Sequence, residues 1–315
     1  MRAIVARDLI KSYASGKERI QALNSVSLDV EAGELFGLIG PDGAGKTSLI
    51  RILTTLILAD RGSASIQGYD VVKDFKQIRT RIGYMPGTFS LYQDLTVEEN
   101  LEFFATVFET TIAGNYDLVK DIYSQIEPFK NRRAGRLSGG MKQKLALCCA
   151  LIHKPSVLIL DEPTTGVDAV SRKEFWDMLH RLKVQGITIL VSTPYMDEAA
   201  LCDRVALIQA GTLLSIDTPD GIIRNFKKPL IAARASDMYR LLMDLKAYHQ
   251  AENCYPFGEF HHVVLSYGAD PERLRTYLFK KSHHDLEFKG VQPDIEDCFI
   301  NLMGAVSPPD PELKP

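Results

Sequence analysis

Apolar and polar residues follow two different periods along the first part of the chain. Residues 22–30 alternate one by one, as in a half-buried strand, and residues 35–39 form the short apolar run of a buried strand. Further apolar runs at 157–160 and 187–191 enclose a predicted helix at 172–184. A helical stripe also follows the first apolar run, at Leu49, Ile50, Ile52, Leu53 and Leu56. These patterns predict an α/β core.

Helices are predicted to interrupt this core between about residues 90 and 153. Thr96 and Glu99 have the spacing of a capping box, in which each side chain bonds the other residue's backbone N–H. A later helix is predicted to begin at Ser138 and to run to about His153. Residues 1–225 are therefore predicted to form one domain, an α/β core with a helical subdomain.

From residue 227 the pattern changes to short strands and helices in the order βαββαβ, followed by one more helix. This order is typical of a ferredoxin-like unit, so residues 226–306 are predicted to form a small C-terminal α+β domain. Residues 307–315 contain four prolines in nine positions and are predicted to be a disordered tail. The predicted strands are 229–233, 253–257, 262–267 and 286–291, and the helices are 237–248, 271–280 and 295–303.

Composition excludes several classes of protein. The chain has 315 residues, 45% hydrophobic and 24% charged, so it can bury a large core. Lys and Arg number 37 against 40 Asp and Glu, which argues against nucleic acid as a partner. The apolar runs are too short for a signal peptide or a membrane span, so a membrane role requires a partner protein. Five cysteines without metal-type spacing indicate reduced thiols in a cytosolic protein.

Residues 40–47 match the pattern G-x-x-x-x-G-K-[ST] between a predicted strand and a predicted helix. Glycines let backbone N–H groups approach phosphate oxygens, and the helix start adds its positive end. Lys46 is expected to reach the β- and γ-phosphates, and the Thr47 hydroxyl to bind Mg²⁺. The expected nucleotide-binding residues of this loop are Gly40, Pro41, Asp42, Gly43, Ala44, Gly45, Lys46, Thr47 and Ser48.

Two acidic residues follow the apolar run at 157–160. Because ligands of open α/β sheets bind at the carboxyl ends of the strands, Asp161 is expected to hold Mg²⁺. Glu162 is expected to be the catalytic residue, a general base that polarises an attacking water.

Ser138, Gly139 and Gly140 form a second helix start suited to an anion. One chain binds one nucleotide but carries two such helix starts. The economical explanation is that the second serves a nucleotide bound by another copy.

The motifs at 40–47, 137–141 and 157–162 resemble, in this order, those of ABC transporter ATP-binding subunits, specifically the ATPases of ABC-2-type exporters. The resemblance covers roughly residues 3–220 and implies a P-loop NTPase cassette with a RecA-like core and a helical subdomain. It implies that Tyr13 stacks on adenine and that Asp168 belongs to the D-loop at residues 165–168. The C-terminal unit resembles the accessory domain of YbhF-like multidrug exporters.

The same resemblance implies partners and a location. ATP and Mg²⁺ are expected to lie between two subunits in a head-to-tail homo- or heterodimer, which drives an ABC-2-type transmembrane permease. The chain is then cytoplasmic and peripheral on the inner face of the cell membrane. Residues 90–92 and 94–100 are similar to the segment that meets the permease. Leu91 and Tyr92 are expected to line a groove for a permease helix, with plain core packing as the alternative.

Two positions depart from the family pattern. Gly87 stands where the Q-loop glutamine is expected, and Pro194 stands where the switch histidine is expected. Proline offers neither a side-chain hydrogen bond nor a backbone N–H, and loss of one stabilising donor costs ~10²–10³ in rate. The hypothesis is that the chain binds ATP well, hydrolyses it slowly alone and supports a more competent partner site. Compensation by Thr88, Gln93 or Thr193 is the competing possibility.

Two other functions remain as alternatives. A soluble ABC ATPase of translation or DNA repair is disfavoured, because the chain has one cassette and a net charge of −3. A nucleotide-gated module that does not turn over is compatible with Gly87 and Pro194. The histidine pairs at 261–262 and 283–284 suggest a metal site, but neighbours in a strand point to opposite faces, so surface or edge-strand histidines are expected.

Overall fold

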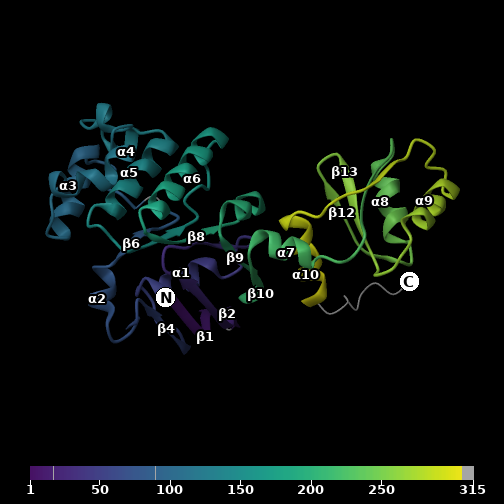
Figure 1. Ribbon diagram of the computed structural model, residues 1–315, viewed down its shortest axis with the longest axis horizontal. Helices are drawn as coiled ribbons and strands as arrows, with labels where there is room; N and C mark the ends of the chain where they lie inside the picture. The colour runs from purple at the N-terminus through teal and green to yellow at the C-terminus, as the bar shows by residue number, and fades with distance from the viewer. Residues whose placement is uncertain (17, 89, 307–315) are drawn as a thin grey trace. The chain divides into compact units, whose positions relative to one another are not determined.

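The computed structural model describes residues 1–16, 18–88 and 90–306 (Figure 1). The predicted disordered tail at 307–315 lies outside these residues. The chain divides into two compact units, Met1–Pro219 and Asp220–Pro315, so the division falls before the predicted domain boundary at residue 225.

A six-stranded sheet with the order β10-β9-β3-β8-β7-β6 forms the centre of the first unit. Its strands are parallel except β10, which pairs antiparallel with β9. All residues of β3, β7 and β8 are buried, as expected for parallel strands covered on both faces. The strands are β3 (Leu35–Ile39), β6 (Ile82–Met85), β7 (Val157–Asp161), β8 (Thr188–Thr193), β9 (Arg204–Gln209) and β10 (Thr212–Asp217).

Helix α1 (Lys46–Leu53) lies between this sheet and a second, antiparallel sheet with the order β2-β1-β4-β5. Leu49, Ile50 and Leu53 of α1 join one hydrophobic cluster with buried residues of both sheets. This packing fixes the helix from two sides and therefore fixes the loop that precedes it. The strands of the second sheet are β1 (Arg2–Ser15), β2 (Glu18–Glu31), β4 (Arg61–Ile66) and β5 (Tyr69–Asp70).

The predicted helical subdomain is present between β6 and β7. The capping box at Thr96 and Glu99 is confirmed, because both reciprocal hydrogen bonds begin α3. Helix α6 follows β7 and contacts β3 and β8. The helices of the first unit beyond α1 are α2 (Phe75–Arg79), α3 (Val97–Val107), α4 (Tyr116–Tyr123), α5 (Gly139–Leu151) and α6 (Ala169–Val184), and α7 (Pro219–Asn225) begins at the division between the units. None of the described helices combines the length and apolar character needed to cross a membrane.

The second unit contains an antiparallel sheet with the order β12-β13-β11-β14, which is the strand order of a ferredoxin-like unit. Helices α8 (Met238–Lys246) and α9 (Pro271–Lys280) share one core with the sheet, and Ile300 of α10 (Ile295–Val306) packs with a smaller cluster. The strands are β11 (Leu230–Arg234), β12 (Ala251–Phe257), β13 (Phe260–Leu265) and β14 (Glu287–Gly290).

The expectation of surface or edge-strand histidines is wrong at three positions. His261 and His262 are buried on β13, an inner strand, and His283 is also buried. His262 Nδ1 lies 2.7 Å from Asp297 Oδ1, and His283 Nε2 lies 2.9 Å from Asp244 Oδ2. Each of these two rings is buried because a carboxylate pairs with it, which satisfies its polar nitrogen.

Candidate functional site

The glycine-rich loop at residues 40–48, called here the P-loop, connects β3 to α1. Its glycines are required by close packing: a Cβ on Gly45 would lie 2.3 Å from Ala22 O, and one on Gly40 would lie 2.2 Å from Ile208 O. Gly45 also has a φ of 104°, in the region that favours glycine. The sequence pattern therefore corresponds to a tight backbone turn at the start of a helix.

Lys46 lies almost entirely inside this loop, with 3% of its surface exposed. Its Nζ donates to Gly40 O at 2.7 Å and to Pro41 O at 2.9 Å. The same Nζ lies 3.1 Å from Glu162 Oε1 at the end of β7. One buried ammonium group thus links the P-loop to the predicted catalytic carboxylate.

Thr47 and Asp161, the two predicted metal ligands, are in contact. Thr47 Oγ1 donates to Asp161 Oδ1 at 3.2 Å, and Ser192 Oγ donates to the same oxygen at 2.8 Å. The contact arises because β3, β8 and β7 are neighbours and end at the same edge of the sheet. Burial and, second, the negative charge of Asp161 raise the pKa of Tyr84 to about 12.

Glu162 occupies a strained turn directly after β7. Its φ of 51° lies in the left-handed region, which residues other than glycine enter rarely. Its N–H donates to Ser192 Oγ at 3.0 Å and lies 3.1 Å from Ser192 O. Ser192, which the sequence analysis did not select, therefore holds both acidic residues. Its position near the end of a buried strand, two residues before Pro194, was the available signal.

A cleft of about 260 Å³, the P-loop cleft, is lined by Tyr13 and by six of the nine predicted residues of the P-loop. Tyr13 is 38% exposed there, and its hydroxyl lies 3.2 Å from Ser48 Oγ. Gly40 and Pro41 contribute their carbonyl groups to Lys46 instead of lining the cleft, and Asp42 is exposed. The lining residues are Tyr13, Ala22, Gly43, Ala44, Gly45, Lys46, Thr47, Ser48 and Glu162.

Ser138 and Asp168 each cap a helix away from the lining of this cleft. Ser138 Oγ accepts from Met141 N at 3.4 Å at the start of α5, and Asp168 Oδ1 accepts from Ser171 N at 3.0 Å at the start of α6. The hydrogen bonds from Ser171 hold the pKa of Asp168 below its usual value. A Cβ on Gly140 would lie 2.7 Å from Ser171 Oγ, so the two helix starts are packed closely.

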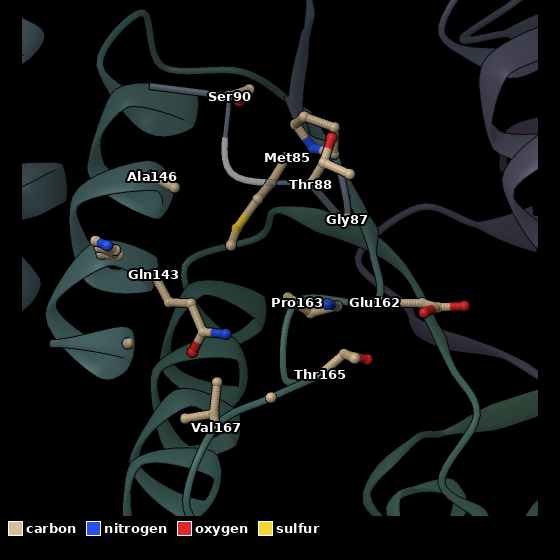
Figure 2. A pocket seen from close by; sticks show the side chains of 14 residues that line it. Met85, Gly87, Thr88, Ser90, Gln143, Ala146, Glu162, Pro163, Thr165 and Val167 are labelled. Carbon is tan, nitrogen blue, oxygen red and sulfur yellow. The ribbon is translucent and has the colours of Figure 1, made fainter. Parts of the chain in front are cut away.

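Gly87 lines a second cavity of about 240 Å³, called here the Gly87 cavity (Figure 2). A Cβ on Gly87 would lie 3.0 Å from Asp161 O, which is tighter than most such contacts. In Figure 2 the Gln143 side chain points into the cavity, whereas the Glu162 carboxylate points away from Gln143. The cavity therefore lies beside the end of β7, lined by residues 85–88 and Ser90, by α5 and by residues between 162 and 167.

The three residues considered as replacements for the missing groups lie in different places. Thr88 lines the Gly87 cavity. Gln93 is absent from the described lining of both cavities, and its carbonyl accepts from Gly135 N at 2.9 Å. Thr193 is buried, and its hydroxyl donates to Glu198 Oε2. Pro194 follows it directly at the end of β8.

An apolar surface is present on the helical subdomain near the predicted permease-contact segment. Leu91 is buried, whereas Tyr92 is 49% exposed. The Tyr92 ring packs edge-on against Phe103 with 4.8 Å between centroids, and Val107 on the same helix is also exposed. Tyr92 is therefore available for contact with another protein, and Leu91 belongs to the core.

Comparisons with known proteins agree with this geometry. Residues 23–165 match the family model described as ABC transporter. The chain is 37% identical over 287 residues to the "Probable multidrug ABC transporter ATP-binding protein YbhF" of Escherichia coli K12, covering 90% of this chain and 49% of that protein. It is 36% identical over 286 residues to the "Nod factor export ATP-binding protein I" of Burkholderia lata, covering 90% and 92%.

A solved structure extends the likeness to the fold. It is a dimeric ATP-binding cassette in a post-hydrolysis state with ADP and Pi, with a TM-score of 0.62 and 25% identity, covering 68% of this chain and 98% of that one. The chain spans about half the length of the E. coli relative.

Proposed function

The chain belongs to the ATP-binding proteins of ABC transporters, and on that premise we propose that it binds and hydrolyses ATP as the energy-supplying subunit of a membrane exporter. The observation that carries the proposal is the contact between Lys46 and Glu162 and between Thr47 and Asp161 at one sheet edge. These four groups supply a phosphate-binding cation, two metal-binding oxygens and a base.

The described residues fit a triphosphate with Mg²⁺. The loop N–H groups and the Lys46 ammonium provide positive potential for the phosphates. Carboxylate and hydroxyl oxygens, as on Asp161 and Thr47, are ligands that Mg²⁺ prefers. When bound, Mg²⁺ neutralises charge that develops on the phosphate oxygens.

Glu162 is the base in this proposal. The phosphates compete for the Lys46 ammonium, which now pairs with the Glu162 carboxylate. The carboxylate then accepts a proton from the attacking water, while Ser192 keeps the Glu162 backbone in place.

A second ABC subunit completes each ATP site in this proposal. Ser138, Gly139 and Gly140 are absent from the described lining of the P-loop cleft, although they start a helix suited to an anion. A head-to-tail homo- or heterodimer brings this helix start and Asp168 to the ATP of the other copy. The dimeric cassette structure supports the arrangement.

The partner that uses the energy is an ABC-2-type permease in this proposal, and the chain is peripheral on the cytoplasmic face of the membrane through it. The names of the multidrug and Nod factor export relatives support an exporter. The exposed Tyr92, Phe103 and Val107 supply an apolar contact surface for such a partner.

The second part of the proposal is that the chain hydrolyses ATP slowly in the absence of a partner. Gly87 and Pro194 offer no side-chain hydrogen bond to the nucleotide, and the hydroxyl of Thr193 is bound to Glu198. A nucleotide-gated module without turnover is the second candidate that these positions favour.

One set of measurements separates these functions. The ATPase rate of the purified chain is measured alone and with its co-expressed permease, for the native sequence, Glu162→Gln and Lys46→Ala. Stimulation by the permease that Glu162→Gln abolishes supports the exporter subunit. Nucleotide retention without turnover in either state supports the module, and an unchanged nucleotide affinity of Lys46→Ala refutes both.

A further inference from the structure

A buried carboxylate lies behind the candidate site, on the short 3₁₀ helix η4 (Met196–Leu201). Glu198 is 2% exposed. Its Oε2 accepts from Thr193 Oγ1 and, at 3.1 Å, from Thr164 Oγ1. Its Oε1 lies 3.6 Å from Arg172 Nε. One side chain thus joins the end of β8, the segment after Glu162 and helix α6.

Each of these three partners is also connected to predicted site residues, by a hydrogen bond or by its position in the chain. Thr193 O accepts from Gly40 N of the P-loop at 3.3 Å, and the preceding Ser192 bonds both acidic residues. Thr164 is fully buried and follows Glu162 by two positions. Arg172 lies in the first turn of α6, where its N–H donates to the carbonyl of Asp168 at 2.9 Å.

The burial of Glu198 makes these contacts interdependent. A buried carboxylate is costly unless it is paired and hydrogen-bonded, so displacing one partner destabilises the remaining arrangement. Arg172 is held in turn by Asp197 at 2.8 Å and stacks over Tyr195 at 4.6 Å. Thr193 at the end of β8 and Arg172 on α6 are therefore joined through one buried carboxylate.

Because Pro194 stands where the switch histidine is expected, the contact between Thr193 and Glu198 gains importance for the backbone after β8. Pro194 has no side-chain hydrogen bond, and Tyr195 N donates to Thr193 Oγ1 at 3.1 Å. The backbone at Pro194 and Tyr195 is consequently held by the Thr193 hydroxyl, which donates in turn to Glu198.

We propose that Glu198 is a positioning residue that couples β8 at Thr193 to α6 at Arg172, close to the predicted D-loop residue Asp168, and thereby couples the two ATP sites of the dimer. The coupling between sites rests on the proposed function. The link within one chain rests on the contacts above, and amide hydrogen exchange tests it separately.

The test uses the full chain with Glu198→Gln, which keeps the shape of the side chain and removes its charge. Arg172→Met breaks the same link from α6 and serves if Glu198→Gln fails to fold. Asp177→Asn is the matched control, because Asp177 is an exposed carboxylate on α6 and takes no part in the contacts of Glu198 or Arg172 described above.

The expected result is a split between catalysis and binding. In Glu198→Gln and Arg172→Met, kcat falls roughly tenfold, the KM for ATP stays within about twofold, and the ATP dependence loses its cooperativity. Amide hydrogen exchange of residues 165–172 accelerates in both variants, measured without nucleotide. The double variant is no slower than the more affected single variant, because both remove one link.

Two results overturn the proposal. One is that the exchange rate at residues 165–172 and the kcat of both variants equal those of Asp177→Asn. The other is a rise in KM with kcat unchanged, which places Glu198 in nucleotide binding. If exchange accelerates while the native chain shows neither ATPase activity nor ATP-dependent dimers, the link stands and the proposed function fails.

Discussion

Lys46 Nζ lies 3.1 Å from Glu162 Oε1 and donates to two P-loop carbonyl groups at the same time. The ammonium group is buried, so each acceptor satisfies part of a charge that solvent hardly reaches. A phosphate that enters the loop competes for this group. In the proposed function, nucleotide binding therefore also releases the Glu162 carboxylate from Lys46.

Removal of the Lys46 ammonium should therefore abolish nucleotide retention. For Lys46→Ala we expect affinity for ATP to fall by about 10²-fold or more, because a charge-assisted contact in a buried site is lost. Equilibrium binding of a fluorescent ATP analogue measures this. Lys76→Ala, at an exposed position on α2, is the control and should bind as the native chain does. Equal affinity of both variants would contradict the assignment.

Replacement of Glu162 by glutamine should separate binding from hydrolysis. We expect Glu162→Gln to hydrolyse ATP about 10²–10³-fold more slowly, since the base is lost while the shape is kept. The variant should retain its affinity for ATP. In the presence of ATP it should form a stable dimer, which analytical ultracentrifugation detects. Glu174→Gln, at an exposed position on α6, should change neither property. A native hydrolysis rate in Glu162→Gln would show that another group is the base.

Local patterns were sufficient to predict the glycine loop, the acidic strand end and one of the helix starts of the candidate site. The glycine loop, the acidic strand end and the helix start at Ser138 are encoded by neighbouring residues, and the structure places them at the expected element ends. Helix α6 instead begins at Ala169, with Asp168 as its N-cap, before the predicted start at residue 172. The meeting of the glycine loop and the acidic strand end at one sheet edge follows from parallel strands with a shared direction. The capping box at Thr96 was predictable for the same reason.

Groups that act through distant partners were not predictable. Asp161 accepts a hydrogen bond from Ser192. The buried Glu198 accepts a hydrogen bond from Thr164, which lies 34 positions away. His262 is buried because Asp297, 35 positions away, pairs with it. Strand β4 carries a weak apolar pattern and forms by pairing with β1. Such features depend on tertiary contacts that no local window contains.

Restoring the missing side chains should raise the rate of the isolated chain. We expect Pro194→His to increase basal hydrolysis roughly 10- to 100-fold, because it returns a hydrogen-bonding side chain beside the γ-phosphate. Gly87→Gln should give a smaller gain, because its Cβ would lie 3.0 Å from Asp161 O and the segment must shift.

The gain is measured as phosphate release by the purified chain, with Glu162→Gln introduced into each restored variant as the control. Any gain must disappear in that background, since the base is still required. A fast native rate that neither restoration changes would refute the slow-site hypothesis.

The buried Tyr255–Asp297 pair should make the second unit sensitive to alkali. Burial and, second, the hydrogen bond to Asp297 raise the pKa of Tyr255. A group whose folded pKa is raised contributes stability below its unfolded pKa of about 10 and loses it as the pH rises, by at most ~1.4 kcal/mol per pH unit. Denaturant unfolding of the full chain from pH 9 to 12 should show this loss, and Tyr255→Phe should reduce it. Tyr239→Phe, at a 75% exposed position, should keep the native slope, and equal slopes in both variants would exclude Tyr255 as the cause.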